Sequence, residues 1–172
     1  GSEMCIRDRI THGCLGLWDD AQVPGLARIA AFLRSQGAVP AIQLGHAGRK
    51  ASMQRPWFGN GPLGPDDLAR GDLPWPTIAP SAVPIDERWQ VPAAMTEGDL
   101  ATVRDAFVAA TRRALAAGFD VVEVHGAHGY LLHAFLSPLS NRRDDAYGGP
   151  LAHRMRFPLE VVEAVRAAWP QD

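Results

Sequence analysis

The sequence predicts an α/β fold with a parallel sheet, and within that class an internal fragment of a larger β/α barrel. Amphipathic helical segments alternate with short apolar strands along the chain, the pattern that right-handed β/α units produce. Only two strands can be assigned, and both would need neighbours in a parallel sheet. The chain has 172 residues, whereas a complete (β/α)8 TIM barrel takes about 250.

Composition excludes several classes of protein. Hydrophobic residues make up 47% of the chain, which is ordinary for a globular domain. No apolar run approaches the roughly 20 residues of a membrane span. A net charge of −2 gives no electrostatic reason to expect nucleic acid or an anionic membrane as partner. The two cysteines, Cys5 and Cys14, form neither a metal-ligand spacing nor a disulfide framework, so a reducing, cytoplasmic setting is expected.

The first residues differ from the rest. Residues 1–9 show no periodicity and begin with Gly-Ser, and they lack the apolar core of a secretory signal. We therefore expect residues 1–9 to be an artefact or a truncated end, and residues 10–172 to form part of one domain.

The first helix and strand are expected between Asp19 and Leu44. Asp19 and Asp20 precede an apolar stripe at helical spacing, and Gly37 is placed to end the helix. Residues 38–44 form a buried strand in which Pro40 must sit where no ladder donor is needed. The predicted stripe consists of Val23, Leu26, Ile29, Ala30, Leu33 and Arg34.

A long insertion follows, from residue 45 to about residue 95. It is rich in proline and glycine and is predicted to be loop-like. Loops of this length in compact domains are usually lids or binding insertions, here a capping insertion. Its aromatic side chains suggest that it packs down rather than extending into solvent; they are Trp57, Phe58, Trp75 and Trp89.

The second half repeats the helix and strand. Thr96 and Asp99 form a capping box for a helix that Gly118 ends. The strand over 120–125 comes next, and a short helical piece over 130–136 follows it. After a polar loop over 141–150, an amphipathic helix is predicted over 151–169.

The turn after the second strand brings His125, His128 and Tyr130 together. The imidazoles could join Glu123 or His133 as metal ligands of a barrel hydrolase. They could also be inert core histidines, or paired donors that grip a substrate oxygen and stabilise negative charge there. The glycines at 126 and 129 permit a flat ring to approach, and the phenol adds an acid; both favour paired donors.

A second set of polar residues follows the first strand. Gln43 presents an acceptor and a donor side by side, which suits a pyrimidine-like ring such as that of flavin. Its alternative role is to satisfy buried backbone groups. Arg49 and Lys50 could neutralise a phosphate or an anionic ring, or simply be solvated.

Three stretches closely resemble the Old Yellow Enzyme family, in particular its bacterial NADPH dehydrogenase or xenobiotic reductase branch, the thermophilic-like ene-reductases. The stretches are residues 43–49, 125–133 and 135–149, and Leu15-Gly16-Leu17-Trp18-Asp19-Asp20 is similar to that branch as well. The resemblance runs from about Arg9 to the end of the chain.

The resemblance implies an FMN-binding TIM barrel that NADH or NADPH reduces and that then reduces an activated C=C bond of an α,β-unsaturated carbonyl or nitro compound. By this likeness Gln43 binds the flavin pyrimidine ring. Residues 125–128 (His125, Gly126, Ala127 and His128) bind the substrate, and both histidines hold its electron-withdrawing oxygen. Tyr130 protonates the α-carbon. The resemblance implies a small-molecule substrate and no metal. It is also compatible with a homo-oligomer for the full-length protein.

The chain departs from the family pattern in places. Cys14 is not expected to take the role of the family's early flavin-side cysteine. The run Leu151-Ala152-His153-Arg154 replaces the more usual Glu-Asn-Arg. The flavin-facing arginine and the phosphate-binding strands would lie beyond Asp172, so this piece is expected to be inactive alone. A metal-dependent hydrolase using Glu123, His125 and His128 and an inert barrel fragment stay open as alternatives.

Overall fold

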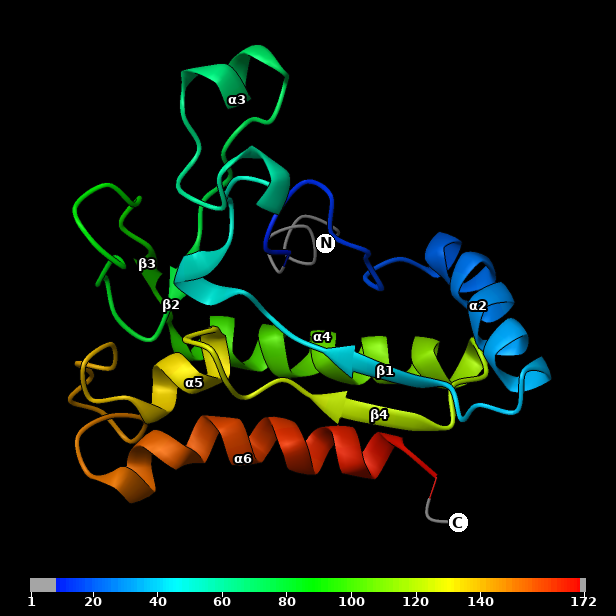
Figure 1. Ribbon diagram of the computed structural model, residues 1–172. Helices are drawn as coiled ribbons and strands as arrows, with labels where there is room; N and C mark the ends of the chain where they lie inside the picture. The colour runs from blue at the N-terminus through cyan, green and yellow to red at the C-terminus, as the bar shows by residue number, and fades with distance from the viewer. Residues whose placement is uncertain (1–8, 171–172) are drawn as a thin grey trace.

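The computed structural model describes residues 9–170. The prediction about residues 1–9 therefore concerns, apart from Arg9, residues outside this range. Figure 1 shows two strands flanked by long helices, with the insertion projecting from one end. The 3-10 helices are η1 (Asp20–Gln22), η2 (Gly48–Lys50) and η3 (Pro56–Phe58). The α-helices are α2 (Val23–Ser35), α3 (Pro65–Ala69), α4 (Glu97–Ala116), α5 (Leu131–Leu136) and α6 (Leu151–Ala168). The strands are β1 (Ala41–Leu44), β2 (Ile78–Ala79), β3 (Ala93–Ala94) and β4 (Val121–Val124).

Strands β1 and β4 pair in parallel, as predicted, with Gln43 opposite Glu123. The prediction that the first strand begins at residue 38 was wrong, because the end of α2 uses that backbone. Ala38 N–H donates to the Leu33 carbonyl at 3.1 Å, which closes the helix. Pro40 needs no donor there, and its carbonyl accepts from the Asp120 N–H at 2.9 Å.

One face of the two strands is packed against helices. Leu44 is buried, and Val124 packs against the same hydrophobic core. Helix α4 begins with the predicted capping box, in which Thr96 Oγ1 accepts from the Asp99 N–H. The helices complete the core with buried side chains of α4 and α6: Leu100, Val103, Phe107, Ala114, Phe157, Val161 and Val165.

The opposite face of the strands is exposed. Ala41 and Gln43 on β1 are exposed, as are Val121 and Glu123 on β4. Because side chains alternate along a strand, these four residues share the face that would line the interior of a barrel. The loops after both strands begin on this face.

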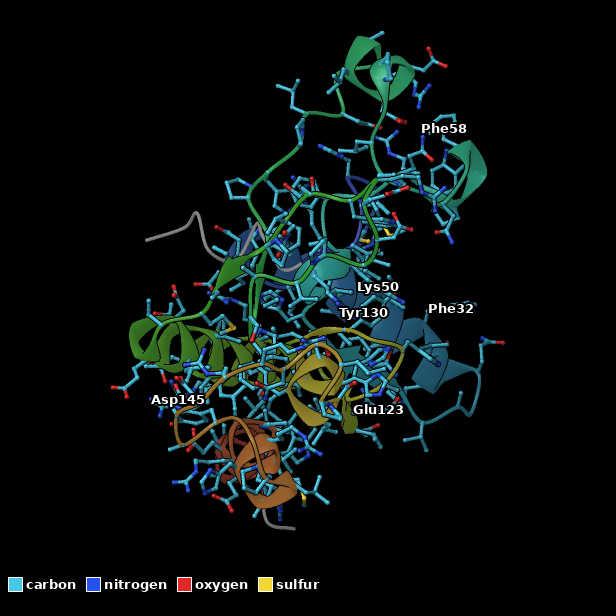
Figure 2. All side chains as sticks on the ribbon, turned by 90° about the vertical axis from the view of Figure 1, so that its left-hand side faces the viewer. Phe32, Lys50, Phe58, Glu123, Tyr130 and Asp145 are labelled. Carbon is cyan, nitrogen blue, oxygen red and sulfur yellow. The ribbon has the colours of Figure 1, made fainter. Side chains whose placement is uncertain are left out.

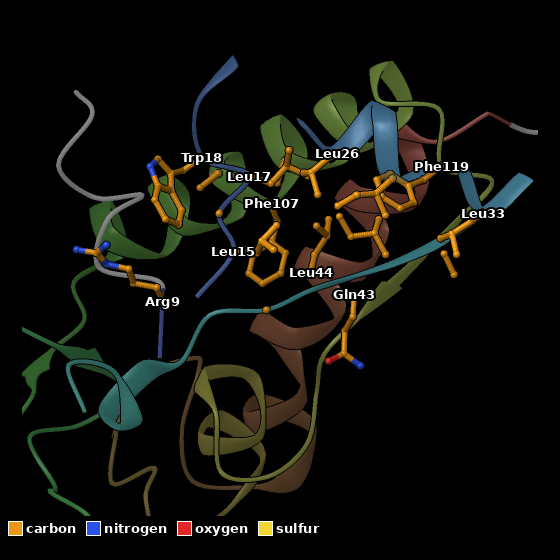
Figure 3. A pocket seen from close by; sticks show the side chains of 17 residues that line it. Arg9, Leu15, Leu17, Trp18, Leu26, Leu33, Gln43, Leu44, Phe107 and Phe119 are labelled. Carbon is orange, nitrogen blue, oxygen red and sulfur yellow. The ribbon is translucent and has the colours of Figure 1, made fainter. Parts of the chain in front are cut away.

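A cavity of about 380 Å³ lies along the edge of β1. Figure 3 shows apolar side chains of α2 and α4 around it, with Gln43 pointing away from Leu44 and Phe107. The predicted α2 stripe is only partly buried, since Leu26 and Ala30 are covered while Ile29 is 46% exposed beside this cavity. Each strand of a closed barrel has two neighbours, whereas among the described residues β1 pairs with β4 alone.

The insertion is more ordered than the predicted loop. It contains η2, η3, α3 and the parallel pair β2 and β3. Trp75 is half-buried, and its ring lies 4.8 Å from that of His12. The prediction that Trp57 packs down was wrong, because η3 lies in the projecting part and leaves that side chain 69% exposed.

Among the helices of residues 9–170, none combines the length and the apolar character that crossing a membrane requires. Arg9, which the sequence analysis sets apart, is part of the folded structure. Its guanidinium carbon lies 4.8 Å from the centre of the Trp75 ring and 5.8 Å from that of Trp18. The segment next to α2 is therefore tied to the insertion.

Candidate active site

The carboxyl ends of β1 and β4 carry the site, and backbone hydrogen bonds join the two loops that follow them. His125 N–H donates to the Leu44 carbonyl at 2.8 Å, and Leu131 N–H donates to the His46 carbonyl at 3.0 Å. Gly48 has φ 61°, and a Cβ there would lie only 3.0 Å from the Leu131 Cα. A side chain at position 48 would separate the loops, so glycine allows their close contact.

The structure brings the three predicted catalytic residues together. The rings of His125 and His128 have centroids 5.2 Å apart, and those of His125 and Tyr130 are 4.8 Å apart. Both pairs are close to perpendicular, at 75° and 70°. The intervening residues, Gly126 and Ala127, are exposed, so the turn is open on the side where a ligand would approach.

Backbone hydrogen bonding fixes the proton position on His125. Ala127 N–H donates to Nδ1 of His125 at 3.1 Å, so this nitrogen is an acceptor and carries no hydrogen in the neutral ring. Nε2 must then carry the hydrogen and act as a donor. An N–H donor is what stabilises negative charge on an oxygen.

Tyr130 stands at the start of α5 and is half-buried. Burial is the larger cause of an upward shift in its pKa, and an electrostatic interaction with Cys14 adds to it. A raised pKa keeps the phenol protonated at neutral pH. Cys14 therefore influences Tyr130, a connection that the sequence analysis did not anticipate.

His46 is a further histidine of this region, and the sequence analysis assigned it no role. It is buried, and its Nδ1 accepts the Gly48 N–H at 2.9 Å. Burial lowers its pKa to about 4, so the imidazole is neutral at neutral pH. Its role in the described structure is to hold the turn at η2.

Gln43 lies apart from this cluster, on the exposed face of β1. Its carboxamide is free of a packed environment and points toward the side that would be the barrel interior (Figure 3). Among the described residues, no hydrogen bond joins this side chain to a buried backbone group. An exposed donor and acceptor pair beside the loop of His125 fits the pyrimidine edge of a flavin.

The metal-site alternative is not supported by side-chain geometry. Within residues 9–170, no three His, Cys, Asp or Glu side chains gather closely enough to hold a metal ion. His125 Nδ1 is already used by Ala127, and His133 Nδ1 accepts the Gly129 N–H at 2.6 Å. Glu123, His125 and His128 thus do not form the expected ligand set.

Both members of the basic pair after β1 donate hydrogen bonds to backbone carbonyls. Arg49 donates to the carbonyls of Val83 and Pro84, at 3.2 and 3.0 Å, and so anchors the insertion. Lys50 donates to the His128 carbonyl at 2.7 Å. Sequence reasoning missed both roles, because each joins segments that are far apart in the chain.

The polar stretch after α5 is structural. Asn141 is buried and donates to the carbonyls of Phe135 and Tyr147, both at 2.8 Å. Arg143 pairs with Asp145 and donates to two carbonyls of the β2–β3 region. The resemblance in residues 135–149 thus reflects residues that support the site.

The site thus combines parallel β/α units with a pair of histidines, a phenol and an exposed carboxamide. The chain belongs to the NADH:flavin oxidoreductase / NADH oxidase family, whose model matches residues 5–172. This family uses FMN.

Curated relatives agree with this assignment. An NADH:flavin oxidoreductase of Gibberella zeae is 44% identical over 164 residues, covering 95% of this chain and 39% of the relative. An NADPH dehydrogenase of Bacillus licheniformis is 43% identical over 161 residues, covering 94% of this chain and 42% of the relative. The chain thus spans about two fifths of the length of the curated relatives it matches.

Solved structures confirm the fold as part of an Old Yellow Enzyme-type TIM barrel. Morphinone reductase superposes with a TM-score of 0.73 at 32% identity, over 88% of this chain and 41% of that structure. The old yellow enzyme homologue from Zymomonas mobilis superposes with a TM-score of 0.72 at 30% identity, over 89% of this chain and 41% of that structure.

Proposed function

We propose that this chain supplies the substrate-binding donors and the proton donor of an FMN-dependent NAD(P)H oxidoreductase that reduces activated C=C bonds. The observation that carries the proposal is the hydrogen bond from the Ala127 N–H to Nδ1 of His125, which leaves Nε2 as the donor of the neutral ring, beside the Tyr130 phenol. The alkenes would be conjugated to a carbonyl or nitro group. The low cysteine count keeps a cytoplasmic location as our expectation.

His125 and His128 would donate hydrogen bonds to the substrate's carbonyl or nitro oxygen. These bonds withdraw electrons from the C=C bond and stabilise the negative charge that develops on the oxygen. When bound, reduced FMN supplies the hydride that adds to the β-carbon, and NAD(P)H restores it. Gln43 would hold the pyrimidine edge of that ring.

Tyr130 would complete the reduction. Its hydroxyl donates a proton to the α-carbon, so the C=C bond becomes a single bond with one hydrogen added to each carbon. The upward shift in its pKa suits this task, because the phenol stays protonated until the enolate needs the proton. The phenolate then recovers a proton from water.

The test uses the complete FMN-loaded protein that carries this chain and compares Tyr130→Phe with Tyr147→Phe. Tyr147 is the chain's other tyrosine, and its hydroxyl lies 3.3 Å from Glu160 rather than beside the histidines. In stopped flow, Tyr130→Phe should slow reoxidation of the flavin by 2-cyclohexenone roughly 10²–10⁴-fold. Flavin reduction by NADPH should change little.

The control should resemble the unsubstituted protein in both half-reactions. Equal losses in the two half-reactions of Tyr130→Phe would show that this tyrosine only supports the fold. An unsubstituted protein that binds no flavin or does not reduce the enone would refute the proposed function itself.

A further inference from the structure

Lys50 connects the two halves of the candidate site. It is the only lysine of the chain, and all the other residues counted as Lys or Arg are arginines. It belongs to η2, after β1, yet its Nζ donates to the carbonyl of His128 in the loop after β4, at 2.7 Å. The same nitrogen lies 5.7 Å from the centre of the Tyr130 ring. Figure 2 shows Lys50 and Tyr130 side by side.

The carbonyl that Lys50 binds belongs to a strained residue. His128 has φ 55°, in the left-handed region that residues with a Cβ seldom adopt. Such a conformation persists only where its surroundings hold it. A charge-assisted hydrogen bond to the His128 carbonyl is one such restraint.

Gly129 lies against the end of the Lys50 side chain. A Cβ on Gly129 would lie 3.3 Å from Lys50 Cε and 3.4 Å from Nζ. Gly129 itself has φ 74°. The turn over residues 128 and 129 therefore lies against the end of the Lys50 side chain, and a planar guanidinium would present its donors to the His128 carbonyl in a different geometry.

We propose that Lys50 is a positioning residue, which holds the left-handed turn at His128 and so sets the direction of the histidine donors relative to the Tyr130 hydroxyl. This inference rests on the proposed function. It assigns Lys50 a geometric effect on the alkene step, with no contact to flavin or substrate.

Electrostatic tuning of Tyr130 is a different role, and the structure does not favour it. Burial is the larger cause of the raised pKa of Tyr130, and the electrostatic interaction that adds to it comes from Cys14, not from Lys50. Replacing Lys50 by arginine separates the two roles, because it retains the charge and changes the shape.

The experiment uses the complete FMN-loaded protein with Lys50→Met, Lys50→Arg, Gly129→Ala and, as control, the exposed Arg142→Met. The readouts are the flavin reduction rate, the rate of reoxidation by 2-cyclohexenone, and the dissociation constant of 4-hydroxybenzaldehyde from flavin absorbance. Flavin content and circular dichroism establish folding.

We expect Lys50→Met and Gly129→Ala to slow reoxidation roughly 10- to 100-fold, since a displacement of about 1 Å can cost 100-fold. Binding of the phenol should weaken several-fold. Reduction by NADPH should stay within about twofold of the unsubstituted rate, because hydride transfer from NADPH takes no proton from Tyr130. Lys50→Arg should not restore the alkene step, and Arg142→Met should change nothing.

Three outcomes would overturn the inference. The first is an unchanged reoxidation rate in folded Lys50→Met and Gly129→Ala. The second is an equal decrease in the rates of both half-reactions, which would indicate a general structural effect. Full activity in Lys50→Arg would assign the effect to charge. Each of these leaves the proposed function standing, whereas an unsubstituted protein inactive toward the enone refutes that function first.

Discussion

The buried His46 should make the protein less stable in acid. Its pKa is lowered to about 4 by burial, while an unfolded chain has the ordinary value of 6.5. Between these values the unfolded state binds a proton that the folded state does not, so stability falls as pH decreases. The contribution is fully present above pH 6.5 and is lost progressively toward pH 4.

The size of the effect follows from the two pKa values. Linkage gives a loss of about 2 kcal/mol in the free energy of unfolding between pH 7.5 and pH 5. His46→Asn removes the titration while retaining an acceptor, because Oδ1 can take the place of Nδ1 for the Gly48 N–H. The variant should therefore lack this part of the pH dependence.

Urea unfolding at pH 7.5 and pH 5.0, followed by circular dichroism, measures the difference. His12, whose pKa is also lowered chiefly by burial, titrates in the same direction but is present in both proteins, so its contribution cancels. An identical pH dependence in His46→Asn and the unsubstituted protein would refute the reasoning. It would mean that His46 accepts a proton within the folded state.

Arg143→Met should lower the free energy of unfolding by roughly 2–4 kcal/mol, because the Pro80 and Met95 carbonyls lose a charged donor. Proteolytic cleavage within residues 80–95 should become faster, and a cleavage rate equal to that of the unsubstituted protein would contradict this prediction. His125→Ala and His128→Ala should each weaken the binding of 4-hydroxybenzaldehyde by about 1.5–3 kcal/mol, and the double variant should weaken it by less than the sum of the two. Unchanged dissociation constants would contradict the role of the histidines as donors. The 172-residue chain alone should not retain FMN, and a stoichiometric flavin spectrum after gel filtration would disprove this.

Sequence reasoning succeeded where short-range chemistry decides the structure. The capping box of Thr96 and Asp99 starts α4 where the local pattern predicts, and β1 and β4 pair in parallel as the alternation of helix and strand indicates. The cluster of His125, His128 and Tyr130 was also predictable, because three nearby positions on one turn must lie close together.

The insertion could not be predicted in the same way. Strands β2 and β3 have two residues each, and no local periodicity marks so short an element. They are held by Arg143, which lies 63 and 48 positions away from the carbonyls it binds. Likewise, Lys50 contacts His128 across 78 positions, so spacing along the chain gives no sign of that partnership.

The two loops of the site are tied to each other inside one continuous stretch of chain. The bonds from His125 to Leu44, from Leu131 to His46 and from Lys50 to His128 all begin and end between β1 and α5. These three bonds therefore form one unit within residues 41–136, which Asn141 and Arg143 support from outside that segment. Recombination between related barrels with crossovers outside residues 41–136 would exchange it intact, whereas a crossover within the insertion would unite loops from different parents.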